Sequence, residues 1–216
     1  MKGLFITFEG PDGSGKSTQI KKLADYLELC QIPYILTREP GGTEISDVIR
    51  SLILNPAYVG LTDKTEILLY AASRAQHVKQ KIKPSLKEGK IVLCDRFIDA
   101  SIAYQGYGLG APIEQVKAIN HYASEGLEPD RTYLIDISPE SARERMQKRA
   151  EKEYNEDLDR IEQRKYAYHR RVREGFKAIR SENKQRICFI NGDQSQDDVF
   201  KIIQEDFIES LKQFSN

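Results

Sequence analysis

The sequence lacks the features that mark several large classes of protein. Its 33 Lys and Arg residues balance 33 Asp and Glu residues, and this absence of net positive charge argues against a dedicated nucleic-acid binder. Its three cysteines are far apart, and no His/Cys cluster suggests zinc. No apolar run approaches the ~20 residues of a membrane span, and the N-terminus has no signal-peptide pattern. We therefore expect a soluble, cytoplasmic protein that binds neither nucleic acid nor membrane.

Short apolar stretches alternate with helical patterns along the whole chain. Stretches rich in Ile, Leu and Phe are typical of strands that helices cover on both faces. The predicted strands are 4–8, 34–38, 91–95, 132–137 and 187–190, and the predicted helices are 17–29, 43–54, 64–88, 113–124, 139–152, 159–183 and 196–214. This order predicts an α/β fold with a five-stranded parallel sheet. No repeat or linker divides the chain, so we expect a single domain over residues 1–216.

One eight-residue segment carries the most specific motif. It fits G-x-x-x-x-G-K-[ST] at every fixed position and lies between a predicted strand and a predicted helix, the context that this P-loop requires. Its glycines let the backbone wrap a phosphate, and the helix N-terminus adds N–H donors. We expect Lys16 to reach the β- and γ-phosphates and the Ser17 hydroxyl to ligate Mg²⁺. The predicted ATP-binding residues are Gly10, Pro11, Asp12, Gly13, Ser14, Gly15, Lys16, Ser17 and Thr18.

Charged residues also follow the second and third predicted strands, where ligands bind in doubly wound sheets. Arg38 precedes a Pro-Gly-Gly turn, so it either presents its guanidinium to an anion or simply leads into the next helix. Asp95 lies where a Walker-B-type acid would hold Mg²⁺, usually through water, although a local ion pair with Arg96 explains the same pattern. Mg²⁺ is therefore the predicted cofactor, with Ser17 and Asp95 as its ligands.

Two further segments are candidates for the wall of a ligand pocket. In the helix predicted over 64–88, Tyr70 precedes Arg74 by four residues, so the two share one helical face. They either stack on a base and bond its edge, or belong to the core, the commoner role of a tyrosine in a long helix. Residues 104–108, Tyr-Gln-Gly-Tyr-Gly, either form an irregular loop or contribute polar groups to a small-molecule pocket.

Taken together and in this order, the motifs resemble the thymidylate kinase family. The matching blocks are Phe-Glu-Gly-Pro-Asp-Gly-Ser-Gly-Lys-Ser-Thr at 8–18, Arg-Glu-Pro-Gly-Gly-Thr at 38–43, Ala-Ala-Ser-Arg at 71–74, Asp-Arg at 95–96 with Ala-Tyr-Gln-Gly at 103–106, and Leu-Asp-Arg-Ile-Glu at 158–162. The resemblance implies a nucleoside monophosphate kinase that transfers the γ-phosphoryl group of ATP to dTMP, giving dTDP for dTTP synthesis. It also implies Mg²⁺ and a homodimer formed through the helix at 64–88.

On the base side, the resemblance implies a role for each matching residue. Tyr70 stands where the family usually has the phenylalanine that stacks on thymine, and Arg74 donates to the thymine edge. Ser101 and Gln105 line the base pocket. Tyr104 lies against the sugar, where it crowds a 2′-OH and so selects deoxyribose.

On the phosphate side, the resemblance implies that Arg38 and Arg96 hold the dTMP phosphate. It also implies that Asp12 faces the acceptor near its ribose 3′-OH and phosphate. The nucleophile is a dTMP phosphate oxygen that is already ionised near neutral pH. We therefore expect no general base.

The segment 143–173 is unusually basic, with 11 Lys and Arg against 7 Asp and Glu. It is either a solvated pair of helices with internal ion pairs or a flap that carries cations over a polyphosphate. The P-loop contains no arginine between its fixed positions, so this chain resembles the bacterial enzymes, which supply a catalytic arginine from a lid. We expect the lid over about 139–160, with Arg149 as that cation ahead of Arg145 and Arg143. The predicted catalytic residues are Lys16, Arg149, Arg96 and Asp12.

Two other classes of function fit part of the pattern. Another P-loop kinase of a small acceptor shares the phosphate motif, but Arg38 and Arg96 favour an acceptor that already bears a phosphate. A nucleotide-binding switch shares it too, although the Asn-Lys-x-Asp guanine motif of GTP switches is absent from the sequence. Measuring which acceptors stimulate ADP release separates these alternatives.

Overall fold

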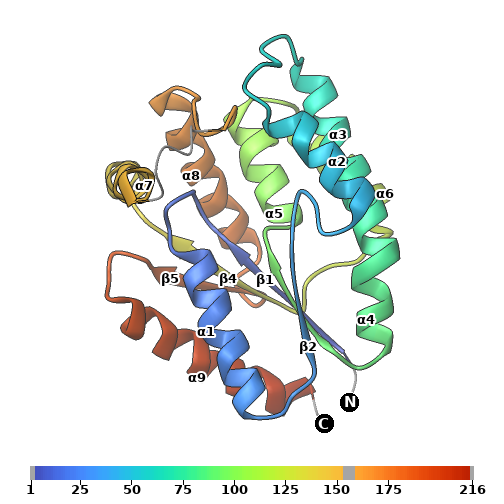
Figure 1. Ribbon diagram of the computed structural model, residues 1–216, viewed down its shortest axis with the longest axis vertical. Helices are drawn as coiled ribbons and strands as arrows, with labels where there is room; N and C mark the ends of the chain where they lie inside the picture. Colours follow the sequence, from blue (N-terminus) through green and yellow to red (C-terminus); the bar gives the residue numbers. More distant parts are fainter. Residues whose placement is uncertain (1–2, 153–158, 215–216) are drawn as a thin grey trace.

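A five-stranded parallel sheet lies at the centre of the structure, a computed structural model that describes residues 3–152 and 159–214. Its strand order is β2-β3-β1-β4-β5 (Figure 1). The strands are β1 (Leu4–Glu9), β2 (Tyr34–Arg38), β3 (Ile91–Asp95), β4 (Arg131–Asp136) and β5 (Ile187–Asn191). The predicted sheet is confirmed, and the bounds of each strand differ from the prediction by one residue at most.

Helices cover both faces of this sheet, as Figure 1 shows. Side chains alternate between the two faces along a strand, and in β1 the residues on both faces are buried. Ile6 and Phe8 pack with residues of α1 (Lys16–Leu29) and α9 (Gln196–Phe214). Phe5 points the other way and packs with Val78 and Ile82 of the π-helix η1 (Val78–Ile82). β1 is therefore buried on both faces, and Thr7 and Glu9 are its polar residues.

The helix predicted over 64–88 is divided into three segments. They are α3 (Asp63–His77), η1 and α4 (Lys83–Lys87). Pro84 lies at the start of α4. Proline has no backbone N–H and its ring crowds the carbonyl four residues earlier, so the α-helical ladder cannot continue through it. The wider π-helical turns of η1 come immediately before this point.

The helix predicted over 159–183 begins later than expected. The observed α8 runs from Tyr166 to Glu182, and residues 160–163 form turns. The Asp159 carboxylate accepts from the backbone N–H groups of Ile161 and Glu162, both over 2.8 Å, and such local bonds compete with a helix. The segment 104–108 differs from the loop alternative, because it belongs to the π-helix η2 (Ile102–Gly108), which continues α5 (Ile98–Ser101).

The remaining helices are α2 (Glu44–Leu54), α6 (Ile113–Ser124) and α7 (Pro139–Lys152). Thr43 caps α2, and its side chain accepts from the Ser46 N–H. Within the described residues, no helix is long and apolar enough to cross a membrane. In Figure 1, α7 lies at the side of the molecule, above the end of β4.

Candidate active site

The P-loop connects β1 to α1 and folds tightly around its own lysine. Gly10 has φ +134°, and a Cβ there would lie 2.2 Å from the carbonyl oxygen of Ile135, so only glycine fits. The Lys16 ammonium donates to the carbonyls of Gly10 and Pro11 over 3.2 and 3.0 Å. Burial and the nearby Arg96 guanidinium lower the pKa of Lys16. The lysine is thus held beside the cleft by carbonyls, which a phosphate can replace.

A cleft in front of the P-loop brings together most of the residues predicted to bind phosphate. Arg38, at the end of β2, borders it, although its guanidinium is half exposed and pairs with Asp47 over 2.9 Å. The cleft is lined by Asp12, Gly13, Gly15, Lys16, Ser17, Thr18, Arg38, Glu39, Arg50, Leu54, Asp95, Arg96, Asp159 and Glu162. Strand ends that are distant in sequence therefore place cations around one space, as parallel topology predicts.

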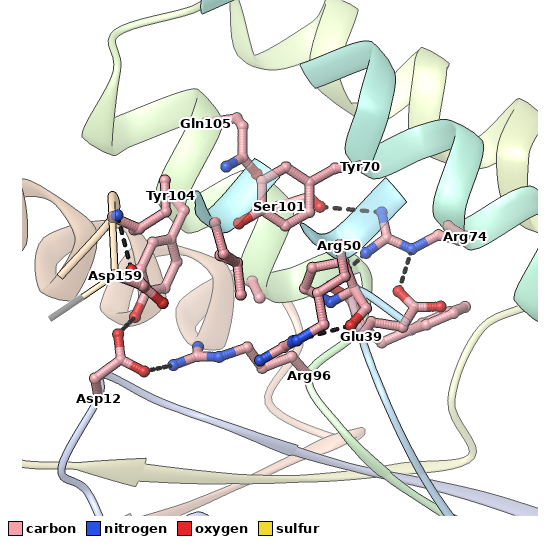
Figure 2. A pocket seen from close by; sticks show the side chains of 15 residues that line it. Asp12, Glu39, Arg50, Tyr70, Arg74, Arg96, Ser101, Tyr104, Gln105 and Asp159 are labelled. Carbon is pink, nitrogen blue, oxygen red and sulfur yellow. Dashed lines mark hydrogen bonds and ion pairs between the residues drawn. The ribbon is translucent and has the colours of Figure 1, made fainter. Parts of the chain in front are cut away.

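Asp12, Arg96 and Tyr104 form a hydrogen-bonded group between this cleft and the next pocket. Arg96 Nη2 donates to Asp12 Oδ1 over 2.6 Å, and its Nη1 donates to the Gly10 carbonyl over 2.9 Å. The Tyr104 hydroxyl donates to Asp12 Oδ2 over 3.0 Å (Figure 2). Burial alone would raise the pKa of Asp12, but Arg96 and Lys16 hold it well below its ordinary value. Asp12 is therefore a fixed carboxylate that orients a cation and a hydroxyl.

Ser17 and Asp95 lie together at the N-terminus of α1. The Ser17 hydroxyl donates to Asp95 Oδ2 over 3.2 Å. The other oxygen, Asp95 Oδ1, is buried and has no hydrogen-bond partner within the described residues. A hydroxyl beside a carboxylate with a free acceptor fits Mg²⁺, which is usually held by one or two protein oxygens together with water and phosphate. In 3–152 and 159–214 no cluster of three or more His, Cys, Asp or Glu side chains offers a metal cage.

A second pocket, shown in Figure 2, shares Asp12 and Arg96 with the cleft. Its cavity volume is about 90 Å³, so the side chains that line it fill much of the space between them. It brings together the residues predicted for the acceptor base and sugar. Its walls are Asp12, Glu39, Pro40, Arg50, Leu54, Tyr70, Arg74, Arg96, Phe97, Ala100, Ser101, Tyr104, Gln105, Asp159 and Ile161. For residues 104–108 the pocket alternative therefore describes the structure better than the loop alternative.

Arg74 is 2% exposed, and its partners leave it little freedom. Its Nε donates to Glu39 Oε2 over 2.7 Å, and Nη2 donates to the Phe97 carbonyl over 3.0 Å. Its Nη1 donates to Ser101 Oγ over 3.0 Å and also to Asn120 Oδ1. These bonds occupy four of the five N–H groups of a guanidinium. Arg74 is therefore locked in place with one donor to spare.

Comparison with known proteins accounts for this combination of cleft and pocket. A family model described as thymidylate kinase matches residues 8–203. The thymidylate kinase of Exiguobacterium sibiricum is 52% identical over 212 residues, covering 98% of this chain and 97% of that protein. The thymidylate kinase of Clostridium novyi is 47% identical over 204 residues, covering 94% and 97%. The chain belongs to the thymidylate kinase family.

A solved structure agrees with this assignment. The crystal structure of thymidylate kinase from Ehrlichia chaffeensis matches with a TM-score of 0.71 and 37% sequence identity, covering 88% of this chain and 93% of that chain. Membership of the thymidylate kinase family confirms the predicted resemblance, the P-loop α/β fold and the enzyme class, a nucleoside monophosphate kinase with ATP as phosphoryl donor.

The three arginines predicted for a lid, at positions 143, 145 and 149, all belong to α7. Arg145 Nη2 donates to the Gly192 carbonyl over 2.9 Å, so it contacts the loop after β5. Arg143 is exposed and lines a space between α7 and the P-loop residue Pro11. The side chain of Arg149, the predicted catalytic cation, lies outside the described residues, as does the part of the predicted lid at 153–158. The assignment of the lid arginine therefore stays a prediction.

Sequence reasoning missed several charged residues of the pocket. Glu39 accepts from Arg74 and also contacts His77 Nδ1 at 2.9 Å. Arg50 lines both the cleft and the pocket and donates to the Pro40 carbonyl over 2.9 Å. Glu66 bonds to Gln105. One signal could have revealed Glu66, because it lies four residues before Tyr70 on the same helical face.

Proposed function

We propose that this kinase transfers the γ-phosphoryl group of ATP to dTMP, with ATP in the cleft over the P-loop and dTMP in the adjoining pocket. The observation that supports this most directly is the pocket itself. It adjoins the P-loop cleft at Asp12 and Arg96, so an acceptor bound there has its phosphate beside the donor. The proposal includes one cytoplasmic kinase domain over residues 1–216.

The residues of the cleft act mainly by position and charge, as phosphoryl transfer requires. Lys16 exchanges its P-loop carbonyls for β- and γ-phosphate oxygens and stabilises the charge that develops on them. A lid arginine, Arg149 first, supplies further positive charge from above. An ionised oxygen of the dTMP phosphate attacks the γ-phosphorus, and the bond to the β–γ bridging oxygen breaks, releasing ADP. No side chain has to remove a proton from this nucleophile.

The acceptor phosphate is held by arginines at the strand ends. Arg96 uses two of its five N–H groups on Gly10 and Asp12, so three remain for an anion. Arg38 borders the same cleft and, being half exposed, is able to swing toward the phosphate. Tyr70 then stacks on the base, Arg74 donates to its edge, and Ser101, Tyr104 and Gln105 complete the walls.

Mg²⁺ belongs to this proposal as the cofactor, held by Ser17 and, through water, by Asp95. When bound, it neutralises charge on the β- and γ-phosphate oxygens. The unpartnered Asp95 Oδ1 supports this assignment. The Ser17 hydroxyl already points at this carboxylate, so both protein ligands are positioned before the nucleotide arrives.

The experiment is an ADP-release assay with ATP and Mg²⁺ across a panel of acceptors. The panel is dTMP, dUMP, UMP, dCMP, dGMP and thymidine. We expect the highest kcat/KM with dTMP and little turnover with UMP or thymidine. If another acceptor is preferred, the assignment of the ATP site stands but the roles assigned to the base-pocket residues are refuted. ADP release that is independent of any acceptor would indicate a nucleotide switch.

We also propose that the enzyme is a homodimer whose partner covers the outer face of α2 and α3. Ile45, Val48 and Leu52 of α2 lie at helical spacing and are 55%, 60% and 40% exposed, and Leu68 of α3 is 51% exposed. Such a row of exposed apolar side chains on packed neighbouring helices marks an interaction surface. A second copy of the chain is the natural occupant, because the family resemblance implies a dimer through α3.

Light scattering after size exclusion tests this arrangement. The chain should run as a dimer, and Val48→Glu should shift it toward the monomer mass by placing a charge in the apolar interface. Leu29→Glu is the matched control, because Leu29 is 85% exposed at the end of α1, away from α2. A monomeric parent, or dissociation by the control alone, would refute this interface.

A further inference from the structure

Glu66 is a buried carboxylate with no role in the reaction proposed above. It lies on α3 one helical turn before Tyr70 and two turns before Arg74, so it shares the face of the helix that borders the pocket. Its side chain is 0% exposed. Burying a carboxylate is costly unless hydrogen bonds and opposite charges surround it. Its partners therefore show what this residue is held there to do.

Two arginines from the end of the lid and the turn after it occupy one oxygen of Glu66. Arg160 Nη2 and Arg164 Nη2 each donate to Glu66 Oε2 over 2.6 Å. Arg160 is itself anchored, because its Nε donates to the Ile53 carbonyl over 2.8 Å and its backbone N–H donates to the Leu54 carbonyl over 3.1 Å. The orientation of the carboxylate is thereby fixed. Oε1 is the oxygen left to accept from another group.

That group is the side-chain amide of Gln105 on η2. Gln105 Nε2 donates to Glu66 Oε1 over 3.1 Å. A carboxylate paired with two guanidinium groups only accepts hydrogen bonds, so Gln105 must turn its NH₂ group toward it. The amide oxygen is then directed elsewhere, and Gln105 Oε1 is buried without a hydrogen-bond partner among the described residues. Gln105 lines the base pocket beside Tyr70 (Figure 2).

Arg74 and Gln105 both line the pocket, and each keeps polar capacity that the printed bonds among the described residues do not use. Arg74 has one N–H left, which is a donor, and Gln105 Oε1 is an acceptor. Thymine carries a carbonyl acceptor next to its N3–H donor, whereas cytosine carries an amino donor next to an unprotonated N3. The pair formed by Arg74 and Gln105 is complementary to thymine, and it places donor against donor and acceptor against acceptor for cytosine. Unpaired polar groups of this kind are costly when buried.

We propose that Glu66, clamped by Arg160 and Arg164, is a positioning residue that fixes the Gln105 amide with its oxygen toward the base and so makes the pocket select thymine over cytosine. This inference rests on the proposed function, since it places dTMP in the pocket. Without the Glu66 carboxylate the amide is free to rotate and present NH₂, which the N3 of cytosine accepts. Selectivity thus depends on a residue that does not touch the acceptor.

The test compares kcat/KM for dTMP with kcat/KM for 5-methyl-dCMP, two acceptors that differ only at C4 and N3 of the base. Glu66→Asp keeps the charge near Arg160 and Arg164 but withdraws the carboxylate from Gln105, and should lower the dTMP preference by about 5–10-fold. Glu66→Gln puts an amide in place of the carboxylate, so both this amide and that of Gln105 are able to rotate. It should lower the dTMP preference by ~10–100-fold and raise the absolute kcat/KM for 5-methyl-dCMP. The KM for ATP should stay within about twofold in both.

A double-mutant cycle distinguishes positioning from a general loss of structure. Gln105→Met has no amide to orient, so in this background Glu66→Asp should change the dTMP preference by less than about twofold. A purely structural role of Glu66 would lower the preference equally in both backgrounds. That equal loss, or an unchanged preference in both Glu66 variants, would overturn the proposal. If Glu66→Gln does not fold, Glu66→Asp decides the question alone.

The unmodified protein reports on the proposed function in the same assay. If it does not favour dTMP, the proposed function fails before any variant is compared, and the inference about Glu66 fails with it. If it favours dTMP and the variants do not respond, only the inference about Glu66 fails.

Discussion

The proposed site has a phosphate end at the P-loop and a base end in the adjoining pocket, and the two are built in different ways. At the phosphate end, one continuous loop supplies the backbone N–H groups and Lys16, and its cation contacts carbonyls that a phosphate can displace. At the base end, side chains from α3, η2, the end of β2 and the turn before α8 converge on one pocket. There the charges are already paired, as Arg74 is with Glu39 and Glu66 is with Arg160 and Arg164.

This difference follows from what each end has to recognise. A phosphate is a strong anion, so cations and a rigid backbone cradle suffice to bind it. A base is neutral and is distinguished only by the pattern of its donors and acceptors. The base end therefore needs polar atoms held in fixed directions, and buried ion pairs supply that rigidity at a cost in desolvation.

The largest effect should come from the lid above the phosphate end. Arg149→Ala should lower kcat by ~10³-fold or more, because an arginine that stabilises the transferred phosphoryl group contributes that much. Arg145→Ala is the control, since Arg145 is bonded to the Gly192 carbonyl, and it should cost less than about tenfold. A loss below tenfold in Arg149→Ala would transfer the role to Arg145 or Arg143. Steady-state measurement gives kcat, and a single-turnover experiment gives the rate constant of phosphoryl transfer itself.

Removing the cation of the cradle itself should have the next largest effect. Lys16→Ala should reduce kcat by about 10²–10³-fold, because an electrostatic contact to the developing charge is lost. The affinity for dTMP, measured by equilibrium binding without ATP, should change little, since the base end is intact. Near-normal turnover would remove the P-loop lysine from the mechanism. Weakened dTMP binding would show that the two ends are less separate than their contacts indicate.

The same contrast explains how much of the molecule could be predicted from the sequence. Strand bounds followed from short apolar runs, and the P-loop followed from a contiguous pattern with its strand and helix in place. The divided helix was missed because hydrophobic periodicity does not register the missing N–H of Pro84. The late start of α8 was missed because the bonds that compete with the helix come from the Asp159 side chain.

The base end could be predicted only through the family resemblance. That resemblance placed Tyr70, Arg74 and Gln105 near a base, and all three line the pocket. Their supporting charges could not be found in this way, because Glu39 and Glu66 pair with arginines that lie 35 to 98 residues away in sequence. The spacing of residues along the chain does not indicate partners that are so distant in sequence. The roles of the individual residues in binding and catalysis stay predictions.

Glu9 is the last residue of β1 and is 1% exposed, and it should show how the fold responds to pH. Its Oε1 accepts from the Phe97 N–H over 2.7 Å, directly after Arg96. Burial, together with the nearby Asp99 carboxylate, raises the pKa of Glu9 to about 8. Between the ordinary glutamate pKa of 4.5 and this value, the folded chain keeps a proton that the unfolded chain has released. Raising the pH through this window therefore favours unfolding.

Glu9→Gln should remove that pH dependence, because glutamine mimics the protonated carboxyl. Between pH 5.5 and 7.5, the free energy of unfolding of the variant relative to the parent should rise by about 1 kcal/mol per pH unit, or ~2 kcal/mol in total. Urea unfolding at several pH values measures it. Parallel curves for the two proteins would show that Glu9 is ionised in the fold.

The smallest expected effect concerns the sugar, between the two ends. The Tyr104 hydroxyl donates to Asp12, while its ring packs edge-on against Tyr168 and Phe176. Tyr104→Phe therefore removes the group expected to crowd a 2′-OH and keeps the packing that Tyr104→Ala would lose. The ratio of kcat/KM for UMP to that for dUMP should rise by about 3–10-fold, less than the ~10²-fold by which a pocket rejects an added hydroxyl. An unchanged ratio would mean that the hydroxyl serves Asp12 alone and that sugar selection comes from elsewhere in the pocket. Tyr104 would then belong with the fixed charges of the phosphate end.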